Sequence, residues 1–165
     1  MEKIRGKVWK FGDDINTDAI SPGRYMNLPM DEIKKHALEV VDPEFALKVQ
    51  PGDVIVGGGN FGCGSSREEA PAVLKACGIA AVVAESFARI FFRNAIAVGL
   101  PVAACHGVSD AFKQGDELEL DLDSGRVTSL KTGAVLTSEP LPSEMKEVIS
   151  RGGIMPMLEE IAAKQ

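Results

Sequence analysis

The pattern of apolar and polar residues predicts two kinds of β-strand. Residues 4–11 and 117–123 alternate apolar and polar side chains, which is the period of a strand with one buried face. Residues 54–56, 79–84 and 100–104 are instead short continuous apolar runs. Such runs are typical of strands buried on both faces, as in a parallel sheet. The chain therefore combines a buried sheet with strands that have one exposed face.

Helical patterns separate the three buried runs. We expect Ser65 or Ser66 to cap a helix that runs to about Cys77, and Ser86 to cap a second helix that ends near Ala97. The order strand–helix–strand–helix–strand with brief connections predicts right-handed crossovers and a mostly parallel βαβαβ core of the α/β class. Further short helices are expected at 29–38, 42–50, 143–150 (capped by Ser143) and 155–164, and small antiparallel strands at 126–130 and 134–137.

Composition narrows the class of protein. The length of 165 residues, 45% of them apolar, fits a single domain over residues 1–165. The net charge of -6 argues against a nucleic-acid partner, and no window is apolar enough to predict a membrane span or a signal peptide. Three cysteines without CxxC spacing suit free thiols in a reducing cytoplasm.

The candidate chemistry is concentrated in residues 53–69. Five glycines occur within residues 57–64, after a buried strand and before a helix. This arrangement directs backbone N–H groups at an anion. Two hydroxyls and a guanidinium follow at once. The predicted anion loop is Gly62, Cys63 and Gly64, followed by Ser65, Ser66 and Arg67.

Several known glycine-loop sites fit this segment poorly. The third glycine of a dinucleotide fingerprint would fall at Arg67, and a P-loop needs Gly-Lys-Ser/Thr. A hydrolase that used a serine or Cys63 as its nucleophile needs a histidine partner, and neither His36 nor His106 is placed for one. A tight turn followed by a helix cap remains the alternative. A serine becomes a base only if its alkoxide is stabilised, which a helix N-terminus and Arg67 would do beside a carboxylate substrate.

Several motifs resemble the small subunits of aconitase-type hydro-lyases. They are Phe11-Gly-Asp-Asp-Ile-Asn-Thr-Asp-Ala-Ile-Ser-Pro-Gly23, Asn60-Phe-Gly-Cys-Gly-Ser-Ser-Arg-Glu68, Glu85-Ser-Phe-Ala-Arg-Ile90 and Arg93-Asn-Ala-Ile-Ala-Val-Gly-Leu-Pro101. The resemblance implies a swivelling β/β/α domain that closes over a large subunit. That partner would hold a [4Fe-4S] cluster through its own cysteines, so this chain itself would bind no metal or cofactor. The implied reaction is reversible dehydration of a small hydroxy dicarboxylate.

The resemblance also implies residue roles. Ser65 would be the base that removes the carbon-bound proton, Arg67 would bind a substrate carboxylate, and Ser66 would donate a hydrogen bond. Asp18 matches a site residue of the family. Specificity is expected in the segment after Pro-Gly, where the uncharged Asn27 would leave a third carboxylate without a partner. Apolar neighbours there suit an apolar substituent, although Arg24 could supply a cation. The segment comprises Arg24, Tyr25, Met26, Asn27 and Leu28.

The leading prediction is therefore the isomerisation of 2- and 3-isopropylmalate in leucine biosynthesis. Dehydration of 2,3-dimethylmalate or a methylmalate, and homoaconitase activity, are alternatives within the class. Outside it, the chain could be an anion-binding domain that has lost catalysis, or a serine or cysteine hydrolase. The isolated chain could also self-associate. No role is expected for either histidine, and Arg89 and Arg93 are expected to be structural or to contact another subunit.

Overall fold

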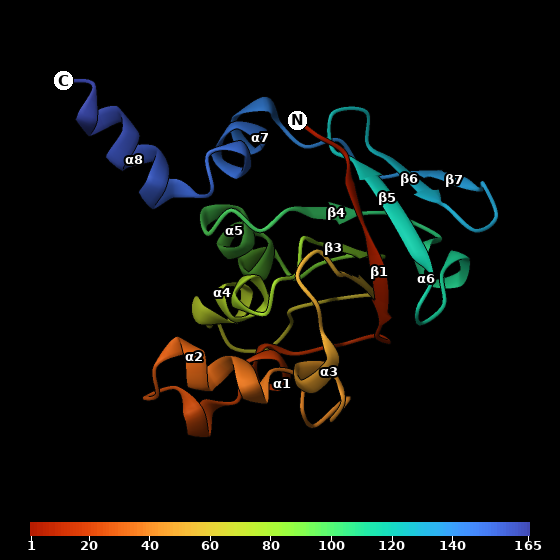
Figure 1. Cartoon of the computed structure of the whole chain (residues 1–165), viewed down its shortest axis with the longest axis horizontal. Coiled ribbons are helices and arrows are strands. Elements are labelled where there is room, and N and C mark those ends of the chain that lie inside the picture. Colours follow the sequence, from red (N-terminus) through yellow and green to blue (C-terminus); the bar gives the residue numbers. More distant parts are fainter.

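The computed structural model describes all residues from 1 to 165 and contains a single seven-stranded sheet (Figure 1). Its strands are β1 (Ile4–Lys10), β2 (Val54–Gly57), β3 (Ala81–Ala84), β4 (Val102–Ala104), β5 (Glu117–Asp121), β6 (Arg126–Ser129) and β7 (Val135–Thr137). Their order across the sheet is β4-β3-β2-β1-β5-β6-β7. The first four strands are parallel to their neighbours, and the pairs from β1–β5 onward are antiparallel.

The two halves of the sheet have the burial that their sequences predict. Every residue of β2 and β3 is buried, because helices and neighbouring strands cover both faces. Val56 of β2 lies opposite Val83 of β3 in the parallel register. In β5 the buried side chains alternate with more exposed ones, so that Leu118 and Leu120 enter the core. The α/β prediction with a parallel core and small antiparallel strands is confirmed.

Helices lie on both sides of this sheet. Figure 1 shows α4 and α5 on one side of β1, whereas α6 and strands β5–β7 lie on the other. The helices α4 and α5 contact each other, α1 packs on α4, and α7 packs on α5. The helices are α1 (Thr17–Ile20), α2 (Met30–Ile33), α3 (Phe45–Lys48), α4 (Glu69–Ala76), α5 (Arg89–Ala97), α6 (Val108–Ala111), α7 (Ser143–Ser150) and α8 (Ile154–Ala163), with 3-10 turns η1 (Gly23–Tyr25) and η2 (Lys34–His36).

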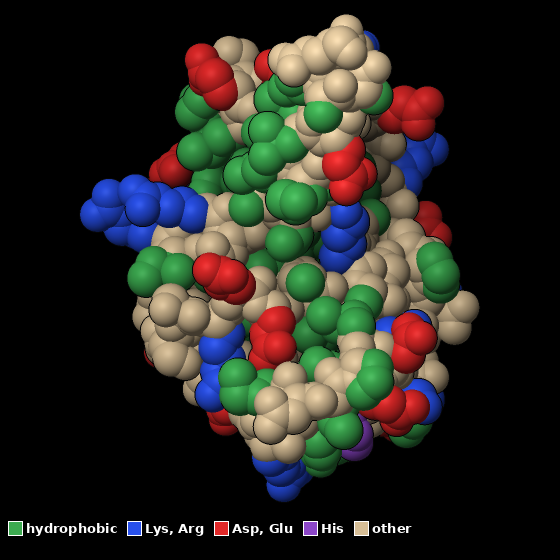
Figure 2. All heavy atoms as spheres, turned by 90° about the vertical axis from the view of Figure 1, so that its left-hand side faces the viewer, with side chains coloured by type: hydrophobic (Ala, Val, Ile, Leu, Met, Phe, Trp, Pro, Cys, Tyr) green, Lys and Arg blue, Asp and Glu red, His purple; other side chains and the backbone are tan.

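The last helix, α8, extends away from the rest of the chain and buries none of its residues (Figure 1). Its side chains Ile154, Met155, Leu158 and Ile161 remain exposed. Figure 2 shows apolar side chains spread over this side of the molecule, from α8 at the top down across the middle. No helix is long and apolar enough to cross a bilayer.

Three predicted helix caps are wrong. Helix α4 begins at Glu69, so Ser65 and Ser66 lie outside it, and the Arg67 N–H instead closes a turn onto the Ser65 carbonyl at 2.9 Å. Helix α5 begins at Arg89, because the Ser86 hydroxyl oxygen accepts from the backbone N–H of Asn60 at 2.8 Å instead of capping the helix. Ser143 is the first residue of α7, after Pro142, and not its cap.

Candidate active site

The glycine loop is held against the segment that follows β1. The Gly62 N–H donates to the Ile15 carbonyl at 2.7 Å, and the Thr17 N–H donates to the Cys63 carbonyl at 2.8 Å. The Thr17 hydroxyl then donates to the Ser65 carbonyl at 2.7 Å. Two motifs that are almost fifty residues apart, at positions 17 and 65, are therefore tied side by side. Both follow the carboxyl ends of parallel strands, where ligands bind in open α/β sheets.

Gly62 allows this close approach. Its φ is +83°, a region that L-residues with a side chain rarely adopt. A Cβ on this residue would lie 2.1 Å from the Phe91 ring, on the first turns of α5. Any side chain would push the loop off the helix. Because the Gly62 N–H is already bonded to Ile15, it is not available to an anion, which corrects its predicted role as a donor.

Ser65, Arg67 and Asp18 come together as the motifs predict. The Arg67 Nε–H donates to the Ser65 hydroxyl oxygen at 3.3 Å. The Arg67 Nη2 lies 3.1 Å from a carboxylate oxygen of Asp18, and that oxygen also accepts from the Gly23 N–H at 3.0 Å. Asp18 therefore orients the guanidinium that contacts the serine.

One nitrogen of this guanidinium has no partner. Arg67 Nη1 is buried and makes no hydrogen bond with any protein atom. A buried N–H without an acceptor costs free energy comparable to a lost hydrogen bond, so native proteins rarely keep one without a reason. The backbone N–H groups of Gly64, Ser65 and Ser66 also donate to no protein acceptor. The site thus has several unused donors around the Ser65 hydroxyl.

The source of positive charge differs from the sequence prediction. Helix α4 starts four positions after Ser65, so its dipole does not act directly on the hydroxyl. Arg67 is the nearby positive charge, and the unpaired loop N–H groups replace the expected helix end. This loop geometry can stabilise an oxyanion through fixed donors in the same way.

The cavity at this site is small. Its volume is about 70 Å³, and both serines are exposed. Sites that enclose a small molecule usually measure about 300–1,000 Å³. The chain therefore provides one wall of a site rather than a closed one. The cavity is lined by Thr17, Gly62, Gly64, Ser65, Ser66, Arg67, Ala88, Ile90, Phe91 and Asn94.

The predicted specificity segment is anchored by His36, for which the sequence suggested no role, and by Glu39, which it did not single out. Arg24 Nη2 lies 2.9 Å from Glu39 Oε1, and its guanidinium carbon lies 4.9 Å from the centre of the Tyr25 ring. The His36 ring stacks on the Tyr25 ring with their centroids 3.6 Å apart, and His36 Nδ1 lies 2.9 Å from Glu39 Oε2. Arg24 is therefore committed to Glu39 rather than free for substrate. We call Arg24, Tyr25, His36 and Glu39 the loop clamp.

The clamp fixes the start of the segment and leaves its end open. Met26 is 52% exposed and Leu28 43% exposed, and Asn27 is also exposed. In the same loop, Gly23 packs against Arg67. A Cβ at this glycine would lie 2.9 Å from both terminal nitrogens of the guanidinium. This loop thus touches Arg67 directly. No signal in one sequence relates positions 36 and 39 to this loop, because the contacts are tertiary.

Neither the cysteines nor any other group forms a metal site. No three His, Cys, Asp or Glu side chains are close enough to hold a metal ion. Burial raises the pKa of the Cys77 thiol to about 11, and burial together with Glu85 raises the pKa of Cys105 to about 11. These two thiols are protonated at neutral pH and are poor ligands and nucleophiles. The residues present do not fit an iron–sulfur cluster.

Comparison with known proteins identifies the family. Residues 8–104 match the model of the aconitase C-terminal domain. The chain is 52% identical over 98% of its length to the isopropylmalate/citramalate isomerase small subunit of Methanocaldococcus jannaschii, 96% of which is covered. It is 54% identical to the 3-isopropylmalate dehydratase small subunit 1 of Methanopyrus kandleri, over 94% of this chain and 92% of that one.

A solved structure agrees with these relatives. The crystal structure of 3-isopropylmalate dehydratase from Methanocaldococcus jannaschii superposes with a TM-score of 0.92 at 42% identity. The match covers 99% of this chain and 98% of that chain. The β/β/α resemblance inferred from the motifs is confirmed.

Proposed function

The chain belongs to the aconitase C-terminal domain family, and we propose from this that it is the small subunit of a cytoplasmic 3-isopropylmalate dehydratase. This hydro-lyase would interconvert 2- and 3-isopropylmalate by dehydration and rehydration in leucine biosynthesis. The observation that carries the proposal is the unpartnered Arg67 Nη1, buried beside the Ser65 hydroxyl. It is a donor prepared for an anionic ligand next to a group that can accept a proton.

In this proposal Ser65 accepts the carbon-bound proton of the substrate. The ordinary pKa of an alcohol is far too high for a base, so the alkoxide must be stabilised where it forms. The Arg67 Nε–H already points at the Ser65 oxygen over 3.3 Å, and the backbone N–H groups of the loop lie at the same cavity. Fixed donors of this kind favour the charged form without reorganising during the reaction.

Arg67 also binds the substrate carboxylate. Its Nη1 is unused, whereas Nη2 is held by Asp18 at 3.1 Å. Because Nη1 is buried beside Gly23, a carboxylate can pair with it only after that segment moves aside. The pair would then complete the hydrogen bonding of the guanidinium without displacing Asp18. Because the carbon that loses its proton is adjacent to a carboxylate, one guanidinium can orient the acid and favour the deprotonated serine. Ser66 adds a hydroxyl at the cavity.

The second half of the site belongs to a partner. The relatives are named small subunits, and the cavity of about 70 Å³ is too small to enclose a dicarboxylate. We assign the covering wall to the large subunit of the dehydratase. Because no residues here fit an iron–sulfur cluster, we assign the [4Fe-4S] cluster to that subunit as well. The isolated small subunit is then inactive.

The specificity segment favours a substrate with an apolar substituent. Met26 and Leu28 are exposed next to Gly23, and Asn27 carries no charge for a third carboxylate. Arg24 is held by Glu39, which removes the nearest alternative cation. These contacts favour isopropylmalate over homoaconitate. Citramalate is a second candidate substrate, because one relative is named an isopropylmalate/citramalate isomerase.

Reconstitution tests the proposal. The chain is mixed with its cognate, cluster-loaded large subunit, and formation of the unsaturated acid is followed from 2-isopropylmalate, 3-isopropylmalate, citramalate, 2,3-dimethylmalate and homocitrate. We expect turnover only in the mixture, with isopropylmalate preferred. Absence of turnover with every acid, although a complex forms, would support a domain that has lost catalysis. Hydrolysis of esters by the isolated chain would favour the hydrolase alternative.

A further inference from the structure

Helix α5 presents one exposed stripe formed by Arg89, Ile90 and Arg93. The arginines at 5, 24, 67 and 151 each form an ion pair. Arg89 and Arg93 have no acidic partner within 4 Å, so their charges are not neutralised within the chain. Next to them on the helix surface, Ile90 is 50% exposed. This stripe combines an apolar side chain with two uncompensated positive charges.

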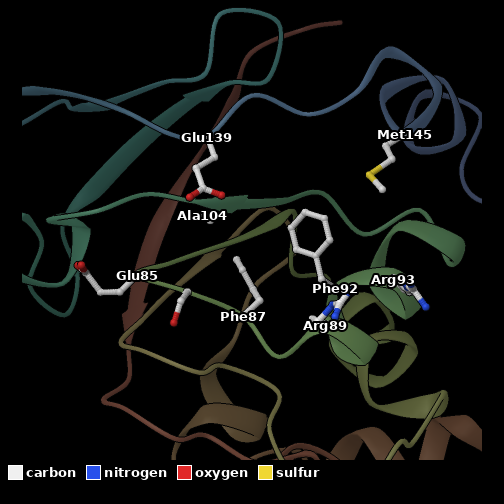
Figure 3. Close-up of a pocket in the computed structure, with 9 residues that line it drawn as sticks. Glu85, Phe87, Arg89, Phe92, Arg93, Ala104, Glu139 and Met145 are labelled. Atoms are coloured by element: carbon white, nitrogen blue, oxygen red, sulfur yellow. The ribbon is translucent and has the colours of Figure 1, made fainter.

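The stripe separates two hollows. On one side, Ile90 lines the active-site cavity together with Phe91 and Asn94. On the other side, both arginines line a groove of about 340 Å³ (Figure 3). Figure 3 shows Phe92 pointing from α5 into this groove, with Arg89 and Arg93 on the helix below it, Met145 above and Glu139 across from it. The groove is therefore apolar at its centre and basic along the α5 side.

The acidic groups near the groove do not neutralise the arginines. Glu85 is occupied, because its two carboxylate oxygens accept from the Gly107 N–H at 2.9 Å and from the Ser109 N–H at 2.7 Å. Glu139 makes no ion pair and lies on the opposite side of the groove (Figure 3). The α5 side is thus left for an acidic group that the chain itself does not supply.

A subunit that seals the active site must also reach this stripe. It has to cover Ile90, which forms part of the cavity wall, and the two arginines lie beside that residue on α5. Covering a guanidinium removes its hydration, and this is unfavourable unless a carboxylate takes its place. The covering surface must therefore be acidic where it meets α5.

We propose that Arg89, Arg93 and the adjoining groove form the docking site for an acidic segment of the large subunit. Its carboxylates pair with the two arginines, and an apolar side chain of the same segment packs on Phe92 and Met145. The inference rests on the proposed function for the identity of the partner. A second copy of this chain is a poorer occupant, because a two-fold contact at the stripe would bring four guanidiniums together.

The test uses the double variant Arg89→Glu/Arg93→Glu and the intact cognate large subunit. We expect the Kd of the complex, measured by calorimetry, to rise at least tenfold and to lose most of its dependence on salt. At saturating large subunit, kcat should return to near the wild-type value, because neither residue touches the reacting atoms. Arg126→Glu is the matched control, since Arg126 is exposed on β6 and unpaired. Arg89→Lys/Arg93→Lys should retain most of the affinity.

Other outcomes would overturn the proposal. An unchanged Kd in a folded double variant means that the stripe does not dock the partner. A fall in kcat at saturation with no change in Kd would place the arginines in catalysis instead. If the isolated wild-type chain is a dimer that only the double variant dissociates, while binding to the large subunit is unaffected, the stripe joins copies of this chain. Binding is measured without substrate, so it reports on docking even if wild-type turnover is absent.

Discussion

The Arg67 Nε–H donates to the Ser65 hydroxyl oxygen across 3.3 Å, while Arg67 Nη2 is held by Asp18 at 3.1 Å. The guanidinium is thereby fixed at two of its nitrogens, and the third, Nη1, is buried without a hydrogen-bond partner. The serine faces a cation whose position does not depend on the substrate. This preorganisation is what allows an alcohol to act as a base.

Replacing Ser65 by alanine should abolish proton transfer but leave the fold intact, because the side chain is exposed. We expect kcat of the reconstituted enzyme to fall by about 10²–10⁴-fold, the usual contribution of a positioned acid or base, with little change in KM. Steady-state kinetics measure this split. Ser66→Ala is the neighbouring control and should reduce kcat less. Near-normal turnover of Ser65→Ala would exclude the serine as the base.

Gly23→Ala should weaken substrate binding indirectly, by displacing Arg67. The added methyl group would lie 2.9 Å from the Arg67 nitrogens and displace the guanidinium. Loss of one charged hydrogen bond costs about 1.5–3 kcal/mol, so KM should rise about 10–100-fold. Gly12→Ala is the matched control, because a Cβ at Gly12 meets nothing within 4 Å. Equal KM values for the two variants would show that Gly23 does not support Arg67.

Asn27→Arg should move the substrate preference toward a tricarboxylate. The residue is exposed on the segment that begins at the loop clamp, and an arginine there would add a cation for a third carboxylate. The ratio of kcat/KM for homoaconitate to that for isopropylmalate measures the change, and Asn27→Gln is the uncharged control. If the ratio is the same in both variants, this segment does not determine the substrate.

Because of the loop clamp, the free energy of unfolding should decrease as the pH becomes acidic. Burial alone would raise the pKa of Glu39, but hydrogen bonds from His36, Arg24 and Tyr25 outweigh it and hold the pKa below its ordinary 4.5. A carboxylate with a lowered pKa in the folded state stabilises the fold above its unfolded pKa. That contribution is lost as pH falls below about 4.5 through the folded value.

Thermal unfolding between pH 3 and pH 7 tests the clamp. Glu39→Gln should have a lower Tm than the wild-type chain near neutral pH. Its Tm should also fall by less than the wild-type Tm when the pH is lowered to 3. Glu2→Gln, at an exposed position outside any ion pair, is the control and should follow the wild-type curve. Parallel curves for Glu39→Gln and the wild-type chain would contradict the assignment.

Cys63→Ala should leave turnover nearly unchanged. The thiol lies in the glycine loop, but the loop contacts that form the site come from its backbone, through the carbonyl that accepts from the Thr17 N–H at 2.8 Å. Alanine preserves that contact. Turnover of the reconstituted variant measures the effect, with Cys105→Ala as a buried comparison that should instead lower Tm. Loss of activity with normal folding would favour a cysteine nucleophile.

Periodicity was sufficient to predict the strands but not the starts of the helices. The apolar runs that became β2 and β3 are fully buried. A strand that is apolar on both faces is stable only where other elements cover both faces of the sheet. Ser65 and Ser86 were predicted as caps from their type and position alone. In the fold both residues contact other segments: the Ser65 carbonyl accepts from the Thr17 hydroxyl and the Ser86 hydroxyl oxygen accepts from the Asn60 N–H. The helices begin later.

The sequence by itself determined where the strands lie along the chain, the glycine loop and the identity of the candidate base and its arginine. These depend on local spacing and on motifs that stay contiguous along the chain. Only the tertiary structure decided that Asp18 and Gly23 hold Arg67, that Glu39 takes up Arg24, and that two arginines of α5 remain unpaired beside a groove. Such pairings depend on distances between segments, which packing of the whole chain sets and no local pattern encodes.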